Sequence, residues 1–284
     1  MGWAREPIRQ YMWLNINMPT IKISYSSQNL KTDAEALAAK LGLVLLDSAG
    51  DEKVLPKADY LLKFKPSGLC LESTQQGDHG PIRCDFDSGA ITHRRKYGGG
   101  NGQSIAKAVG ISGKFMPHVL DLTAGMGSDG FVLAGLGCQL TLLERNSIVY
   151  SLLYDGLRRA NLAGIGDSGL AEVVARIDLL EADSLTYLQS LELAQLPDVI
   201  YLDPMFPARK KSAKVKKEMQ AFHGIVGADE DAAELLVLAL QRAKYRVVVK
   251  RSAAAGHLGE MAPSYSRDGK TTRFDVYALH RLPS

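Results

Sequence analysis

The sequence predicts an α/β protein in which a smaller N-terminal α+β domain precedes a parallel sheet covered by helices on both faces. Length is the first observation, because 284 residues suffice for one large domain or two unequal ones. The second is a change of rhythm at His118, after which strand and helix patterns alternate five times, as is typical of a parallel sheet. The third is that the apolar runs before Asp87 are short and separated by turn residues, which indicates a small α+β unit.

The N-terminal part is expected to fold from residue 21 onward. We expect residues 1–20 to be a leader or an expression remnant outside the fold, and residues 21–115 to hold the smaller domain and a basic, glycine-rich junction. The expected strands or extended segments are 21–25, 43–46, 59–64, 68–72 and 82–87, and the expected helices are 33–41 and 103–109. The domain boundary is placed at 112–117.

The C-terminal part, residues 116–284, carries the alternating pattern. Its expected strands are 118–124, 139–145, 176–183, 198–204 and 245–251, and its expected helices are 128–136, 147–162, 184–193 and 229–244. Acidic residues in the first turn support the last of these helices. The Asp268-Gly269 turn predicts a terminal hairpin whose last strand, 274–280, runs antiparallel to the others.

Composition excludes several classes of protein. The three cysteines, Cys70, Cys84 and Cys138, have no C-x-x-C spacing, which indicates reduced thiols in a cytoplasmic protein and argues against a structural zinc site. The six histidines show no metal-ligand spacing, so we expect no metal. No apolar run approaches the roughly 18 residues that span a bilayer, so no membrane partner is expected. A net charge of +3 means that a nucleic-acid partner has to be met by a local basic patch.

A glycine-rich turn follows the first strand of the alternating region. Gly125, Gly127 and Gly130 fit the pattern G-x-G-x-x-G, which many nucleotide-binding folds share. Taken alone, the pattern is equally typical of a tight strand-to-helix turn that needs glycine backbone freedom. The residues around the turn therefore have to decide between the two interpretations.

Acidic residues stand at the ends of four successive strands: Asp121, Glu144, Asp183 and Asp203. One such carboxylate can simply cap the next helix, but the carboxyl ends of parallel strands meet at one crevice. Four carboxylates there would repel the pyrophosphate of a dinucleotide. They suit a cofactor with a sulfonium, an ammonium group, a ribose diol and an adenine amine. The pattern therefore favours S-adenosylmethionine over a nicotinamide dinucleotide.

The fourth strand exits through Asp203-Pro204-Met205-Phe206-Pro207, a segment stiffened by two prolines. The carboxylate of Asp203 and the carbonyl of Pro204 can accept hydrogen bonds from an exocyclic amine, and Phe206 can stack on a base. Rigid positioning of this kind lowers a reaction barrier. The alternative is a proline-stiffened turn with Phe206 in the core.

This segment and several others resemble known families. Asp-Pro-x-Phe is similar to the (Asn/Asp/Ser)-Pro-Pro-(Tyr/Phe) motif of methyltransferases that modify planar amino nitrogens, with Met205 in place of the second proline. Between His93 and Arg251 the chain resembles the RsmJ family of bacterial 16S ribosomal RNA (guanine-N2) methyltransferases. The matching segments are HRRKYGGG, AKAVGI, DLTAGMGSDGFVLAGLGC, LLERN, YLDPMFP, KKSAKVKKEM and VVVKR.

The resemblance implies a Rossmann-like S-adenosylmethionine-dependent methyltransferase sheet that transfers a methyl group to N2 of a guanosine in 16S ribosomal RNA or the small ribosomal subunit. We expect the glycine turn to hold the methionine part of the cofactor, Glu144 its ribose hydroxyls, Asp183 its adenine amine, and Asp203 to bridge cofactor and substrate. We also expect the Glu144 carboxylate to be exposed and to contribute little to the core. The full expected cofactor set is Asp121, Gly125, Gly127, Ser128, Asp129, Glu144, Arg145, Asp183, Ser184 and Asp203, and the expected catalytic set is Asp203, Pro204 and Phe206.

Two basic runs are candidates for contacts to RNA. Lys210 and Lys211 lie in a run that follows the Asp203–Pro207 loop, and charges there can contact phosphates. Arg94, Arg95 and Lys96 precede a run of glycines and can form a second contact. The alternatives are a solvated surface for the first run and a surface linker for the second. Lys250 and Arg251, at the end of the fifth strand, are expected to face the RNA.

Three other functions stay open at this point. One is methylation of a different planar amino nitrogen, such as adenine N6 or a glutamine amide, because the Asp-Pro-Met-Phe segment does not identify the base. Another is a nicotinamide-dependent oxidoreductase, since the glycine pattern alone allows it. The third is a non-catalytic RNA-binding protein that retains the fold.

Overall fold

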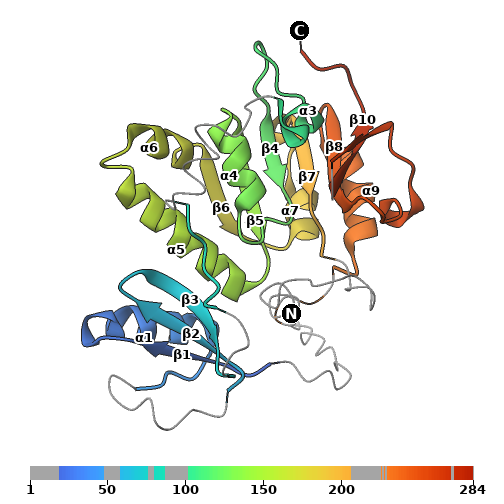
Figure 1. The fold of residues 1–284 in the computed structure, drawn as a ribbon. Coiled ribbons are helices and arrows are strands. Elements are labelled where there is room, and N and C mark those ends of the chain that lie inside the picture. Colours follow the sequence, from blue (N-terminus) through green and yellow to red (C-terminus); the bar gives the residue numbers. More distant parts are fainter. Residues whose placement is uncertain are drawn as a thin grey trace, which may run out of the picture.

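The computed structural model describes residues 19–47, 58–75, 80–86, 102–205, 225, 227, 229–269 and 272–283 (Figure 1). The expected leader is almost entirely outside this range. So are six residues with a predicted role: Arg94, Arg95, Lys96, Phe206, Lys210 and Lys211.

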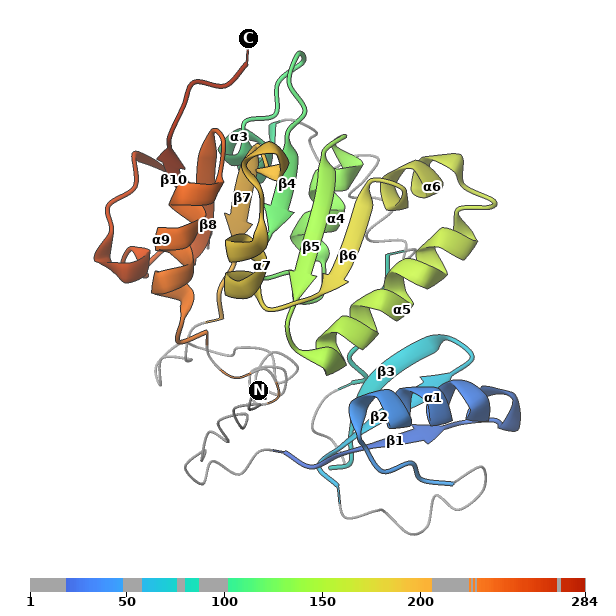
Figure 2. The same ribbon diagram turned by 180° about the vertical axis from the view of Figure 1, so that it is seen from behind.

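The N-terminal part forms a small three-stranded sheet. Strand β1 (Ile21–Tyr25) pairs in parallel with β2 (Tyr60–Lys65), which pairs antiparallel with β3 (Gly68–Ser73). Helix α1 (Lys31–Leu41) lies along this sheet (Figures 1 and 2) and follows the short 3₁₀ turn η1 (Gln28–Leu30). The expected segments around Leu45 and Ile82 each contribute a single bridge to this sheet.

The C-terminal part forms a seven-stranded sheet in the order β6-β5-β4-β7-β8-β10-β9. Five strands run parallel, and β10 runs antiparallel to both β8 and β9, so the predicted parallel sheet with a terminal hairpin is confirmed. The strands are β4 (His118–Asp121), β5 (Gln139–Glu144), β6 (Ile177–Glu181), β7 (Val199–Leu202), β8 (Arg246–Ser252), β9 (Tyr265–Asp268) and β10 (Thr272–Ala278).

Helices cover both faces of this sheet, as Figures 1 and 2 show from opposite sides. Alternate residues of β7 point to opposite faces, with Val199 and Tyr201 in one buried cluster and Ile200 and Leu202 in the other. The helices are α3 (Ser104–Val109), α4 (Ser128–Gly135), α5 (Ser147–Ala163), α6 (Ser168–Val174), α7 (Ser184–Ser190) and α9 (Ala232–Arg242), with 3₁₀ turns η3 (Leu193–Gln195) and η4 (Leu258–Glu260). The sequence analysis did not predict α6.

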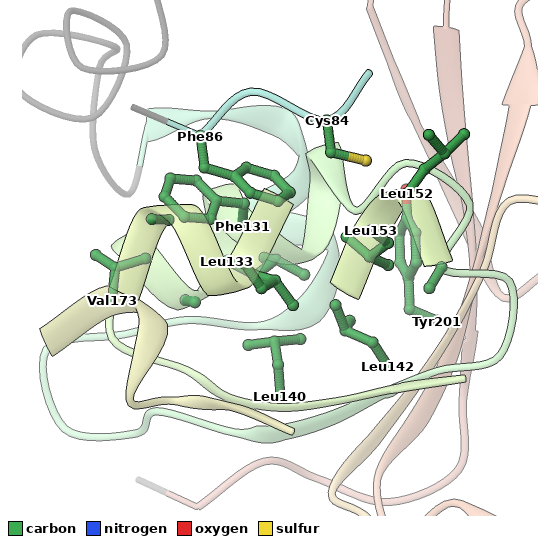
Figure 3. Packing of buried hydrophobic residues seen from close by; sticks show 14 of the residues in the cluster. Cys84, Phe86, Phe131, Leu133, Leu140, Leu142, Leu152, Leu153, Val173 and Tyr201 are labelled. Atoms are coloured by element: carbon green, nitrogen blue, oxygen red, sulfur yellow. The ribbon is translucent and has the colours of Figure 1, made fainter. Parts of the chain in front are cut away.

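The N-terminal part packs against α4 and α5, at the glycine turn. Phe86 stacks on Phe131 of α4 with ring centroids 4.5 Å apart, and Cys84 lies beside α5 (Figure 3). Asp155 of α5, which is buried, accepts a hydrogen bond at 2.9 Å from the backbone N–H of Leu69 in β3. The two parts thus share one buried cluster.

The predicted domain boundary at 112–117 stays a prediction. Helix α3, which precedes this boundary in the sequence, packs against β8 and β10 of the large sheet. No helix in the described ranges is long and apolar enough to cross a membrane. All three cysteines are unpaired and buried.

Candidate active site

The candidate site lies where the strand order of the large sheet reverses. The chain passes from β4 to β5 on one side, and β7 lies on the other side of β4, so the reversal falls between β4 and β7. Ligands of open α/β sheets bind outside the carboxyl ends of the strands at such a point. The segments that follow these two strands are in contact, because the backbone N–H of Asp203 donates to Oγ1 of Thr123 at 2.6 Å.

The three glycines of the turn meet different steric demands. Gly125 and Gly127 have φ angles of +55° and +71°, which other residues rarely adopt. A Cβ on Gly127 would lie 2.5 Å from Leu153, and one on Gly130 would lie 2.7 Å from Leu142, so both positions allow close packing of α4. Among the residues that the structure describes, a Cβ on Gly125 would meet no atom closer than 3.9 Å. Gly125 therefore leaves space at the site.

Glu144, the last residue of β5, holds the glycine turn. Its Oε2 accepts from the N–H of Gly125 at 2.9 Å, and its Oε1 accepts from the N–H of Asn146 at 2.8 Å. The residue is only 6% exposed, and burial raises the pKa of its carboxyl. The expectation of an exposed carboxylate with little part in the core is therefore wrong, because β5 delivers it beneath the turn.

Asp121, the last residue of β4, lies beneath the same turn and is 3% exposed. Its Oδ1 accepts from the N–H of Thr123 at 3.0 Å. Burial, together with the negative charges of Asp129, Asp203 and Glu144, raises the pKa of Asp121 to about 8. This carboxyl therefore keeps its proton at neutral pH.

Asp203 follows β7 and forms an ion pair with Lys250 of β8. The Lys250 ammonium lies 2.8 Å from Oδ2 of Asp203 and 2.7 Å from Oδ2 of Asp129 in α4. Arg251, the next residue, is buried and donates to the carbonyl of Gly256. Arg251 does not face outward, so the expectation that it faces the RNA is wrong. Lys250 is part-exposed at the site, and its expected orientation toward the RNA stays a prediction. Successive residues of β8 point into the site and into the protein.

Met205 continues the Asp203-Pro204 segment into the wall of the site, and Pro204 is buried. The N–H of Met205 donates to Oδ2 of Asp229 at 2.6 Å, and the N–H of Asp229 donates back to the carbonyl of Met205 at 3.0 Å. Asp229 therefore holds the backbone of Met205 through two hydrogen bonds.

Arg145, which follows β5, pairs with two carboxylates that precede α9. Its guanidinium donates to Oδ2 of Asp231 at 2.6 Å and also to Oδ1 of Asp229. Arg145 is one of the residues expected to bind the cofactor. The structure places it at the same edge of the sheet, joining the β5 end to the start of α9.

Asp183 and Ser184 stand at the start of α7 and differ in their roles. Asp183 is exposed, and its Oδ1 accepts from both the N–H and the hydroxyl of Thr186, which caps the helix. Ser184 is buried, and its hydroxyl donates to the carbonyl of Leu122 at 2.6 Å. Ser184 faces the pocket described next, whereas Asp183 is not among the residues that line it.

One pocket joins these segments. Its described lining comprises four carboxylates, one guanidinium and several apolar or small residues: Leu122, Thr123, Gly125, Leu143, Glu144, Arg145, Ser184, Asp203, Met205, Asp229, Asp231 and Leu235. This excess of negative charge favours a ligand with a cationic group. The leucines offer contact to a flat apolar ring, and the carboxylates can accept from a diol or an amine. These residues fit S-adenosylmethionine.

Five of the ten expected cofactor residues line this pocket, namely Gly125, Glu144, Arg145, Ser184 and Asp203. Asp121, Gly127, Ser128 and Asp129 lie in or beneath the turn beside it. Asp229 and Asp231 were not predicted as site residues, because in the sequence they were interpreted as the start of a helix. Their only sequence signal is acidity in a helical first turn, which does not distinguish the two roles.

A second hollow lies at the other end of β8. It has a volume of about 500 Å³, is open to solvent and is lined by Arg246 and residues 278–282. This is the amino-terminal edge of the parallel strands, away from the reversal point, so we assign the candidate active site to the first pocket. In the part of the chain that the structure covers, no three or more His, Cys, Asp or Glu side chains are arranged so that they could hold a metal ion.

Comparisons with known proteins give a consistent result. Residues 49–279 match a family model described as "Putative SAM-dependent methyltransferase". The chain is 49% identical over 258 residues to the ribosomal RNA small subunit methyltransferase J of Cellvibrio japonicus, which covers 90% of this chain and 97% of that protein. It is 46% identical over 262 residues to the protein of the same name from Pseudomonas fluorescens, with 92% and 96% covered.

A solved structure is similar along almost the whole chain. The crystal structure of a SAM-dependent methyltransferase from Neisseria gonorrhoeae superposes with a TM-score of 0.67 at 35% identity, covering 92% of this chain and 97% of that one. The predicted Rossmann-like methyltransferase fold is confirmed by this match. A nicotinamide-dependent oxidoreductase is thereby excluded as the function.

Proposed function

The chain belongs to the family of S-adenosylmethionine-dependent methyltransferases that includes ribosomal RNA small subunit methyltransferase J, and from this premise we propose that it methylates the exocyclic N2 of a guanosine in 16S ribosomal RNA. The observation that supports this substrate chemistry is the position of Asp203 and Pro204. They follow β7 at the reversal point of the sheet, and Asp203 lines the pocket that fits the cofactor.

S-adenosylmethionine supplies a methyl group on a positively charged sulfur. As N2 forms its bond to the methyl carbon, the C–S bond breaks and its electron pair stays on sulfur. N2 then loses one proton. Glu144 is the group proposed to hold the ribose hydroxyls, because it ends β5 at the pocket. Gly125 leaves room for the methionine part. Ser184 borders the region proposed for the adenine.

The target amine is proposed to lie between the Asp203 carboxylate and the Pro204 carbonyl. Hydrogen bonds from N2 to these acceptors localise its lone pair, which is otherwise delocalised into the guanine ring. A guanine inside a helix cannot reach the pocket, so the base has to be extruded or to lie in a single-stranded loop. Phe206, which lies outside the described residues, is proposed to stack on that base.

The decisive experiment follows labelled methyl from S-adenosylmethionine into 16S ribosomal RNA or small subunits, with mass spectrometry of the digested nucleosides. We expect N2-methylguanosine as the product. Label in N6-methyladenosine alone, or in no nucleoside, would overturn the proposal. The second outcome would also favour a non-catalytic RNA-binding protein.

The same assay tests Asp203 when single turnovers are measured at saturating cofactor. We expect D203A to be slower by about ten- to a thousand-fold, because charge-assisted hydrogen bonds are the strong ones and each 1.36 kcal/mol is a factor of about ten. The matched control is D178A, which removes an exposed carboxylate from β6. A near-native rate for D203A would make Asp203 a loop-stabilising residue instead.

Contacts to RNA are proposed for the two basic runs outside the described residues. Charge reversal at Lys210 and Lys211 should weaken RNA binding and reduce its salt dependence, since log affinity changes by about 0.7 to 0.9 per phosphate contact for each log unit of salt. Affinity for S-adenosylmethionine should stay the same. An unchanged salt slope would indicate a solvated surface.

We also propose a cytoplasmic location, which the three unpaired, buried thiols support.

A further inference from the structure

Lys250 lies at the candidate site with its ammonium between two carboxylates. Its Nζ donates to Oδ2 of Asp129 at 2.7 Å and to Oδ2 of Asp203 at 2.8 Å, and its side chain is 24% exposed. The buried hydroxyl of Tyr201 also donates to Oδ2 of Asp129, at 2.7 Å. The lysine is therefore also anchored by a second carboxylate, that of Asp129, which is itself held in place by Tyr201.

Asp203 is fixed at two of its atoms. Its backbone N–H donates to Thr123, and its Oδ2 accepts from Lys250. Its other carboxylate oxygen, Oδ1, accepts no hydrogen bond from the residues that the structure describes, and Asp203 lines the pocket. One oxygen of Asp203 is thus occupied within the protein, and the other is available to a ligand.

The surroundings of Asp203 are otherwise mainly acidic. Burial raises the pKa of its carboxyl, and the charges of Asp129 and Asp229 raise it further, whereas the Lys250 ammonium lowers it. The charged and titratable groups that act on Asp203 are Asp121, Asp129, Tyr201, Asp229, Lys250 and Arg251. Arg251 donates to the Gly256 carbonyl, so Lys250 is the cation that bonds to Asp203 among the described residues.

We propose that Lys250 is a positioning residue for methyl transfer, which holds Asp203 by Oδ2 and keeps its carboxylate ionised so that Oδ1 accepts the substrate amine. This inference rests on the proposed function, because it gives Asp203 its role. A protonated Asp203 would offer an O–H toward the amine and lose its charge. Without the nearby positive charge of Lys250, Asp203 would take up a proton at a higher pH.

A purely structural lysine would behave differently. If Lys250 only joined β8 to α4, its removal would lower stability, or lower the rate by the same factor at every pH. The proposal instead predicts a loss that depends on pH. The variants that separate the two are K250M, which removes both charge and hydrogen bonds, and K250Q, which keeps hydrogen-bond donors without the charge. K250R keeps the charge and serves as the conservative replacement.

The matched control is K244M. Lys244 precedes β8 at the other end of the sheet and also forms an ion pair, 3.6 Å from Asp198, far from the pocket. The experiment measures single-turnover methyl transfer to 16S ribosomal RNA at saturating S-adenosylmethionine between about pH 6 and pH 9, with the melting temperature of each variant. Because K250Q retains donors for both carboxylates, it provides the comparison should K250M not fold.

We expect the acidic limb of the rate profile to move to higher pH by about one unit or more in K250M and K250Q. Relative to the wild type, these variants should therefore lose more rate at pH 6 than at pH 9, by a factor that approaches about ten where the pH lies below both limbs. K250R should retain an acidic limb near that of the wild type. The control K244M should have the same rate profile as the wild type. An unmoved limb in K250Q, or an equal loss at all pH values, would overturn the inference while the proposed function stands. A wild-type protein that methylates no guanine N2 would overturn both.

Discussion

At the scale of single residues, the carboxylates along the sheet edge differ in the hydrogen bonds that their oxygens already accept within the protein. Asp183 caps a helix with one oxygen, and Glu144 accepts from two backbone amides. Asp203 keeps one oxygen available. The sequence could place all of these residues at strand ends, because the strand pattern fixes their positions. It could not assign their partners, since Lys250 and Asp129 meet from positions 121 residues apart.

Glu144 gives the first prediction, through the substitution E144Q. Glutamine keeps one carbonyl oxygen that can accept from one backbone N–H, but it removes the charge and places an amide NH2, which is a donor, toward the other N–H. Loss of a charged hydrogen-bond partner costs about 1.5–3 kcal/mol, so affinity for S-adenosylmethionine should fall by about ten- to a hundred-fold. Titration calorimetry measures this affinity.

S-adenosylhomocysteine is the control ligand for E144Q, because it keeps the ribose and lacks the sulfonium charge. Equal losses for both ligands are expected if Glu144 binds the ribose. A loss confined to S-adenosylmethionine would indicate attraction of the sulfonium instead, and unchanged affinity for both would remove Glu144 from the binding site.

Asp121 gives a prediction about pH and stability. Its pKa is about 8 in the folded protein against 3.8 for the unperturbed group. Unfolding therefore releases a proton between these values, and the stability that depends on this group is lost as pH rises from about 4 through about 8. D121N cannot ionise, yet its side-chain oxygen can still accept from Thr123.

The melting temperature of D121N should accordingly match that of the wild type near pH 4 and exceed it by more than about 3 °C at pH 8, since about 1 kcal/mol corresponds to about 2–4 °C in a protein of this size. D178N, at an exposed position of β6, should show no such divergence. A constant difference across the pH range would mean that Asp121 is ionised throughout in the folded protein.

At the scale of elements, the predicted helices and strands that form end within about three residues of their observed limits, whereas the expected segments 43–46 and 82–87 form only single bridges. Helix α9 begins at Ala232 and not at 229, because the N–H of Asp229 bonds to Met205. Helix α6 was missed because its seven residues are too few for a clear helical period, although Asp167 caps it by accepting from Leu170. Local pattern therefore predicts elements well where they are long, and tertiary contacts determine their limits.

The glycine turn gives the prediction at this scale. In G127A the new Cβ would clash with Leu153 in addition to adopting an unfavourable φ, so a large loss of stability is expected. In G125A the backbone strain of about 1–2 kcal/mol acts without a clash. Because Gly125 lines the pocket, G125A should also weaken S-adenosylmethionine binding.

G42A is the matched control for G125A. Gly42 ends α1 with a φ of +64° and has open space around it, so it isolates the cost of strain at a distance from the pocket. Thermal unfolding and calorimetry should show similar stability losses for G42A and G125A, with weaker cofactor binding only in G125A. Equal cofactor affinity in these two variants would contradict the assignment of Gly125 to the binding site.

At the scale of the whole molecule, the N-terminal part supports the glycine turn. Phe86 lies between Phe131 and the turn, since a Cβ on Gly127 would lie 3.1 Å from its ring. The sequence predicted both parts but not this contact, because packing between segments distant in sequence leaves no local pattern. The contact implies that removing the Phe86 ring affects the cofactor site as well as stability.

F86A should therefore lower the free energy of unfolding by about 3–5 kcal/mol, as large-to-small substitutions of buried aromatics do. It should also weaken S-adenosylmethionine binding, because the turn loses the ring that covers Gly127. The control is L62A, which creates a cavity at a fully buried residue of β2 on the N-terminal sheet. It should lower stability by about 2–5 kcal/mol and leave cofactor affinity unchanged. Denaturant unfolding and calorimetry below the transition separate the two effects. If F86A and L62A bind the cofactor equally well, the N-terminal part stabilises the fold without shaping the glycine turn. Any contribution of the N-terminal part to the reaction would then have to act on RNA binding and not on cofactor binding.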